Sequence, residues 1–408
     1  MAHAHSHGTV GSAAPRTTFL LVVTLVSALL VTLAGLWLLW PNAGDVPDRV
    51  PARAEGTSFV DVTVTGPADP TTGSIPVELP GGEASRMQSP GPSIPLAEGD
   101  RITAVDISQV AQPGVDPLVF MDFQRELPIA LLAIVYALVV LLVARWRGLA
   151  AMAGLGLAFV VLLGFTMPAL LAGESAIGVA LVTSSLVMFV TLYLAHGLSA
   201  RTSTALLGTL VGLALTAGLA AWASGAAQIT GTNDEMSAFL PSSAPGADLR
   251  GIALCGIVLA GMGVLNDVTI TQASAVWELR AVAPAASRSE LFTSAMRIGR
   301  DHIASTVYTI AFAYVGAALP LLMMVWLVDQ SPATALTSGE IAEEVVRTLV
   351  GSIGLVLAIP VTTAIATLTV PGPAGEGSTT PEPASDPELM APVSEAWAAG
   401  PAPGTAAT

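Results

Sequence analysis

The chain has 408 residues, of which 53% are hydrophobic and only 11% are charged, and its mean hydropathy is +0.71. These values are typical of a polytopic membrane protein and argue against an ordinary soluble domain. All 15 basic residues are arginines, the net charge is −15, and no basic cluster suits nucleic-acid binding. The single cysteine, Cys255, excludes an intrachain disulfide and a cysteine-based metal site.

Residues 1–16 form a polar N-terminal tail in which His3, His5 and His7 alternate. Alternating histidines can bind a divalent metal weakly, but the small and polar composition favours a disordered cytoplasmic tail. Residues 17–40 follow as an apolar run of 24 residues, long enough to span a hydrocarbon core of about 30 Å. This run is too long for the hydrophobic region of a signal peptide, so we expect a retained first transmembrane helix.

Residues 41–126 form the largest polar segment, and we expect a small β-rich domain outside the cytoplasm. Ser58–Thr65, Ile75–Leu79 and Arg101–Ile107 are rich in apolar and β-branched residues, which predicts three strands. Gly99 and Asp100 predict a hairpin turn before the third strand. The Pro- and Gly-rich region 80–95 is expected to be poorly ordered.

Residues 127–370 are predicted to form a seven-helix membrane domain, and residues 371–408 a disordered cytoplasmic tail. The predicted fold is therefore an all-α polytopic membrane bundle of about eight transmembrane helices. The β-rich domain lies between the first and second helices. The seven apolar runs of the membrane domain are 127–145, 149–172, 176–196, 203–223, 250–273, 303–328 and 345–370.

Arginine placement predicts the orientation in the cell (inner) membrane. With both termini in the cytoplasm, seven arginines of the short loops lie inside and only Arg250 and Arg347 lie outside. The reverse orientation would place the seven outside, against the tendency of cytoplasmic loops to be rich in Lys and Arg.

The most informative stretch is 251–278, an apolar and glycine-rich helix that turns polar near its end. Its spacing places Asp267, Thr271, Ser274 and Glu278 on one side, with Asn266 and Gln272 nearby. A carboxylate at that depth is costly in hydrocarbon, so we expect Asp267 to face protein or water. Glu278 lies close to the interface, where a solvated role is expected.

A second polar stretch begins at 287, where Ser287 and Glu290 match a capping box. It predicts a short amphipathic surface helix leading to Arg300, Asp301 and His302 and then to the seventh transmembrane helix. We expect these three residues at the mouth of the Asp267 site, with Arg297 or Arg300 as its counter-charge. The glycine spacing in the fifth and sixth helices permits close helix contacts and allows a homo-oligomer.

These patterns favour a transporter-like protein that binds a small solute or ion at Asn266, Asp267, Thr271, Gln272, Ser274, Arg300, Asp301 and His302. In the alternative, the polar residues only fix the packing and the external β domain docks partners. An enzyme using Asp267 and His302 as acid and base is the weakest alternative, because no nucleophile or metal set accompanies them. We expect no enzymatic activity, catalytic residue, metal or cofactor, and the lipid bilayer as the main partner.

Two stretches resemble the signatures of the YibE/F-like family of bacterial multi-spanning membrane proteins. The first is Gly261 to Leu279, which contains LNDVTITQASAVWEL, and the second is Met296 to Pro320, which contains RIGRDHIASTVYTIAFAYVGAALP. The order of a leading helix, an external segment and a helical bundle also fits, so the resemblance covers roughly residues 17–370. It implies an inner-membrane protein for which transport is often supposed, and it assigns no catalytic residue.

Overall fold

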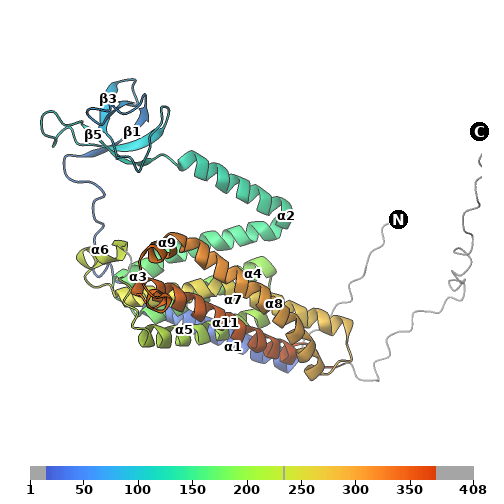
Figure 1. The fold of residues 1–408 in the computed structure, drawn as a ribbon. Coiled ribbons are helices and arrows are strands. Elements are labelled where there is room, and N and C mark those ends of the chain that lie inside the picture. The colour runs from blue at the N-terminus through green and yellow to red at the C-terminus, as the bar shows by residue number, and fades with distance from the viewer. Residues whose placement is uncertain (1–14, 233–234, 374–408) are drawn as a thin grey trace, which may run out of the picture.

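The computed structural model describes residues 15–232 and 235–373, which form a helical bundle and a small β-barrel (Figure 1). A segment of 19 residues links helix α1 to the first strand, and helix α2 leads from the barrel back to the bundle. The predicted tail with His3, His5 and His7, and nearly all of the predicted C-terminal tail, lie outside the described residues.

Five strands form the barrel: β1 (Ser58–Val64), β2 (Ser74–Glu78), β3 (Ala84–Gln88), β4 (Arg101–Asp106) and β5 (Leu118–Phe123). They close in the order β1-β2-β3-β5-β4, with β1 antiparallel to β4 and β3 parallel to β5. This is the strand order of an OB-type barrel. The three predicted strands are confirmed, and a turn is present at Gly99, whose φ is +95°. The prediction of a hairpin is wrong, because β4 pairs with β1 and β5 and not with the preceding β3.

The prediction of poor order for region 80–95 is wrong. Strand β3 runs through this region, and its Met87 is completely buried in the barrel core. The strand has one large apolar residue, so its sequence shows no alternation. Antiparallel pairing of all five of its residues with β2 defines it instead. Strand β5 was also missed, although its buried Leu118 packs in the same core.

The bundle contains helices of very different length. Their bounds are α1 (Pro15–Leu38), α2 (Glu126–Val161), the π-helical turn η1 (Leu162–Thr166), α3 (Met167–Leu171), α4 (Ala176–His196), α5 (Ala200–Ala226), α6 (Glu235–Ser243), α7 (Leu249–Val282), α8 (Arg288–Ala317), α9 (Leu319–Leu327), α10 (Pro332–Leu336) and α11 (Gly339–Thr369). Six helical segments among the described residues are long and apolar enough to cross a membrane, and the bent pair α8–α9 makes a seventh.

The second and third predicted spans are both present as helices, and they meet at a kink at Arg145, whose φ is 54° and ψ −133° (Figure 1). Together they run from Glu126 to Leu171 through α2, η1 and α3. Their 46 residues correspond to about 69 Å of helix at about 1.5 Å per residue. This is more than twice the thickness of the hydrocarbon core.

The predicted surface helix and the seventh span are also arranged differently. Helix α8 runs without interruption from the capping box of Ser287 and Glu290, which is confirmed, to Ala317. The chain then bends by 66° into α9, so the span predicted over 303–328 is broken at Ala318. Pro320, at the start of α9, lacks the N–H that would continue the hydrogen bonding of α8.

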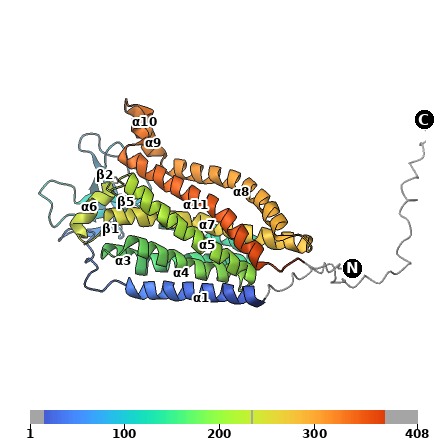
Figure 2. The same ribbon diagram turned by 90° about the horizontal axis from the view of Figure 1, so that it is seen from below.

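Helices α5, α7 and α11 form the centre of the bundle, and α8 lies at its rim (Figure 2). The glycines of α5 are used within the chain, because Gly208 packs on Thr362 while Gly212 packs on Leu265 and Ala358. This side of α5 is therefore not free to bind a second copy.

Candidate functional site

Helix α7 packs against α4, α5, α8 and α11, but one of its sides is not covered by the chain. On this side Gly263, Asp267, Thr271 and Glu278 are exposed, and Ser274 is half-buried. Asp267, Thr271, Ser274 and Glu278 are called the α7 stripe below. The polar end of α7 thus points away from the packed centre of the bundle.

Asp267 is the ionisable residue of the stripe that lies deepest along α7. None of the ion pairs between described residues includes it, and Arg297 and Arg300 are both exposed on α8. The predicted arginine counter-charge is therefore not found within the described chain. Within the described residues no other helix covers the carboxylate, so it faces water or another molecule.

Glu278, at the far end of the stripe, has a different environment. Its Oε1 lies 3.8 Å from Nη1 of Arg201, and both side chains are largely exposed. Exposed pairs of this kind contribute at most about 1 kcal/mol to stability. This position matches the solvated role expected for Glu278.

Gln272 lies on the opposite, buried side of α7. Its Nε2 donates hydrogen bonds to the carbonyl oxygen of Ala295 at 2.9 Å and to Oγ1 of Thr363 at 2.7 Å. Gly299 of α8 lies against the Gln272 side chain, and a Cβ at this position would meet Ile359 of α11 at 2.6 Å. Gln272 therefore joins α7, α8 and α11, and its amide faces protein rather than the uncovered side.

Buried threonines continue this junction between α5, α7 and α11. Oγ1 of Thr209 lies 2.6 Å from Oγ1 of Thr269, and Gly354 packs directly on the hydroxyl of Thr216. These threonines were not predicted as functional or structural residues from the sequence. Each packs on a glycine or a threonine of another helix, and such a pair can be recognised only once the helices are placed in three dimensions. The buried threonines of the three helices are Thr202, Thr204, Thr209, Thr216, Thr269, Thr362, Thr363, Thr367 and Thr369.

His302 of α8 lies close in height to Asp267 of α7. The Gln272–Ala295 hydrogen bond fixes the register of these two helices, which a five-residue link makes antiparallel. Counting about 1.5 Å per residue from that bond, Asp267 and His302 differ in height by only about 3 Å. The predicted meeting of the two polar stretches is therefore consistent with the register.

Two polar atoms near this height are buried without a hydrogen-bond partner among the described residues. They are Nε2 of His302 and Oδ1 of Asn266. Buried polar groups are normally paired with protein, water or a ligand. Asn266 and His302 thus offer unused hydrogen-bonding capacity at a height close to that of Asp267.

Arg300 and Asp301 do not share the position of His302. Both are exposed, whereas His302 is half-buried. Successive residues in a helix are rotated by about 100°, so Arg300 and Asp301 flank the exposed side of α8 and His302 lies on another side. The predicted mouth of Arg300, Asp301 and His302 is therefore not one cluster. The described residues also hold no group of three His, Cys, Asp or Glu side chains suited to a metal ion.

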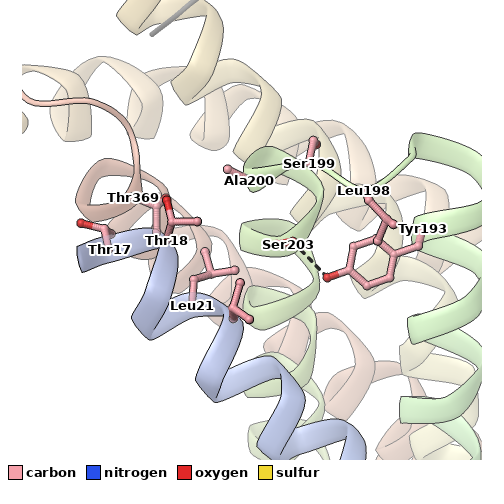
Figure 3. Close-up of a pocket in the computed structure, with 10 residues that line it drawn as sticks. Thr17, Thr18, Leu21, Tyr193, Leu198, Ser199, Ala200, Ser203 and Thr369 are labelled. Atoms are coloured by element: carbon pink, nitrogen blue, oxygen red, sulfur yellow. Dashed lines mark hydrogen bonds between the residues drawn. The ribbon is translucent and has the colours of Figure 1, made fainter. Parts of the chain in front are cut away.

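A pocket of about 310 Å³ lies elsewhere, between the first turns of α1 and the adjoining ends of α4 and α5 (Figure 3). Tyr193 and Ser203 share a hydrogen bond of 3.0 Å on its wall. Hydroxyl and apolar groups line the pocket, without a charged side chain. Its residues are Thr17, Thr18, Leu21, Val22, Tyr193, Leu198, Ser199, Ala200, Ser203 and Thr369. None of the predicted site residues contributes to it.

Comparison with known proteins gives one match. The pattern of the family described as YibE/F-like protein matches residues 132–372, more than half of the chain. The match includes α7, α8 and the stripe but begins after α1 and the barrel, so it is shorter than the expected coverage of 17–370. No curated protein and no solved structure matches the chain.

Proposed function

The chain belongs to the YibE/F-like family of membrane proteins, and on that premise we propose that it transports a small cation or proton, without catalysing a chemical reaction. Asp267 is the ionisable centre of the proposed path. Thr271 and Ser274 supply neutral oxygens along the α7 stripe, and His302 and Asn266 supply further polar atoms beside it.

A single observation carries this proposal: a carboxylate lies on the uncovered side of an apolar helix. A charged side chain at the centre of a membrane helix costs about 2.5–3.5 kcal/mol or more when it faces lipid. Asp267 has no partner within the described chain that offsets this cost. A water-filled path along the stripe removes the cost and gives the carboxylate access to cations.

The proposed topology has eight crossings in the cell (inner) membrane with both termini in the cytoplasm. The 46-residue segment from Glu126 to Leu171 is long enough for two crossings, and Arg145 marks the turn between them. Arg147 and Arg201 both lie near His196, which gathers positive charge at one end of the bundle. That end is cytoplasmic under the arginine rule.

The experiment is a flux measurement on the full chain reconstituted in lipid vesicles, with imposed gradients of H⁺, Na⁺ and K⁺. Wild type should dissipate at least one gradient, and Asp267→Asn should slow this at least about tenfold because it loses the charge. Glu278→Gln is the matched control on the same stripe and should keep the flux. Equal flux in wild type and Asp267→Asn, or no flux of any of the three ions, would contradict the proposal.

A second candidate function is a scaffold that docks a partner through the barrel. The register of β1, β4 and β5 places Phe59, Val105 and Val119 in one row on the outside of the barrel, and Phe59 is 41% exposed. If this row docks a partner, Phe59→Asp should abolish cross-linking to that partner in cells, and deleting residues 45–120 should abolish function. Asp267→Asn would then lower stability without a specific loss of function.

A further inference from the structure

Helix α8 has a second polar surface that points away from the bundle. Arg297, Arg300, Asp301, Ala304 and Tyr308 are exposed, and together they are called the α8 outer face. The opposite side of α8 is buried against α7 and α11. The outer face therefore meets whatever surrounds the bundle at its rim (Figure 2).

This surface lies deep along the bundle. Leu291 packs against Ala366 and Val370, which marks the level where α11 ends. From Leu291 to Asp301 the helix advances by ten residues, or about 15 Å, which is about half of the hydrocarbon core. An exposed carboxylate at this depth is costly in lipid.

Pairing within the chain does not remove this cost. None of the ion pairs between described residues includes Arg297, Arg300 or Asp301. Arginine side chains are long enough to extend toward the membrane surface, but an aspartate side chain is too short to do so. Asp301 therefore calls for a positively charged neighbour from outside the chain.

We propose that the α8 outer face is the interface of a homodimer. Arg300 and Asp301 are separated by about 100° around α8 and by about 1.5 Å along it, with Ala304 and Tyr308 between them on the wheel. A two-fold axis along the membrane normal keeps both copies at the same depth. It also places the Arg300 edge of the outer face in one copy opposite the Asp301 edge in the other copy. Arg300 of each copy then pairs with Asp301 of the other.

The self-complementary charge of this face selects a second copy over other occupants. An anionic lipid would pair with the arginines but would leave Asp301 unpaired and closer to negative charge. The small Ala304 lets the two helices approach closely. The inference goes beyond the proposed function, since it uses a side of α8 other than that of His302.

The test is cysteine cross-linking of the full chain in vesicles, in a Cys255→Ser background. Ala304→Cys should form a disulfide-linked dimer on mild oxidation. Leu215→Cys is the control, because it is 43% exposed on α5, and it should remain monomeric. Light scattering in nanodiscs should give the mass of two chains for the variant without added cysteines.

Charge exchange then tests the pairing. Arg300→Asp alone and Asp301→Arg alone should each lower the cross-linked fraction at least about tenfold, because each removes both symmetry-related pairs and sets like charges against each other. The double exchange should restore it, which also shows that the fold is intact. A monomeric wild type, unchanged single variants or a double variant without rescue would overturn the proposal, including the case in which lipid binds the arginines instead. Asp267→Asn should leave cross-linking unchanged, so failure of the transport proposal remains distinguishable.

Discussion

At the same depth, polar side chains on the two sides of α7 have opposite environments. On the buried side, Gln272 and Thr269 find partners on three neighbouring helices. On the uncovered side, Asp267 and Thr271 find none among the hydrogen bonds and ion pairs of the described chain. Polar groups on the first side hold helices together. Those on the second side have no such partners in the described chain, and the transport proposal rests on this difference.

The largest effect should come from closing a very narrow contact in the packed centre of the bundle, between α11 and α5. Gly354→Ala places a Cβ against the hydroxyl of Thr216, which is held by a 2.8 Å hydrogen bond to the carbonyl oxygen of Gly212. Overpacking of this kind should lower the free energy of unfolding by up to about 3 kcal/mol. The measurement is reversible unfolding in detergent micelles, followed by circular dichroism.

Gly263→Ala is the control on the uncovered side. No atom lies within 4 Å of the position that its Cβ would take. Alanine has a higher helix propensity than glycine, so this variant should be neutral or more stable by up to about 1 kcal/mol. Equal destabilisation by the two variants would mean that the uncovered side of α7 is as tightly packed as the centre of the bundle.

Removal of the Gln272 amide should have the next largest effect. Gln272→Leu loses two buried hydrogen bonds, to Ala295 and Thr363, each contributing about 0.5–1.5 kcal/mol. We therefore expect the free energy of unfolding to decrease by about 2 kcal/mol. Thr271→Val, at the neighbouring exposed position, should change the free energy of unfolding by no more than about 0.5 kcal/mol. A larger effect at Thr271 than at Gln272 would reverse the assignment of the two sides.

The contact between Thr209 and Thr269 offers a smaller and more specific test. A double-mutant cycle with Thr209→Val and Thr269→Val should give a coupling free energy of about 1 kcal/mol, as expected for one buried hydrogen bond. The same cycle with Thr209→Val and Thr271→Val should give a coupling close to zero, because Thr271 is exposed on the other side. Equal couplings would show that the hydroxyl contact does not contribute.

The sequence predicted which residues of α7 share one side, because a helix has a fixed period. It did not predict which side is covered, because this depends on α5, α8 and α11, whose positions are fixed by long-range packing. The arginine counter-charge predicted for Asp267 is absent from the ion pairs of the described chain for the same reason, since Arg297 and Arg300 lie on the exposed side of α8. In the barrel, three strands were predicted because their sequences are rich in apolar and β-branched residues. Strand β3 has no such pattern and is defined by its pairing with β2.

Asp267 should contribute least to stability, although it is the residue on which the transport proposal depends. It makes no hydrogen bond or ion pair within the described chain, so Asp267→Asn should change the free energy of unfolding by less than about 0.5 kcal/mol. In a Cys255→Ser background, cysteines at Gly263, Asp267 and Thr271 should react with a membrane-impermeant thiol reagent in vesicles, because water reaches them.

Thr269→Cys provides the matched control, since Thr269 is fully buried on the other side of the same helix and should not react. Reaction at Gly263, Asp267 and Thr271 only after transfer to detergent would mean that lipid or a partner covers these positions in the membrane. The transport proposal would then lose its main support, because an aqueous path requires water at Asp267 while the bilayer is intact. A large loss of stability in Asp267→Asn would count against it as well, since the carboxylate would then be a packing element with a partner rather than a free ion-binding group.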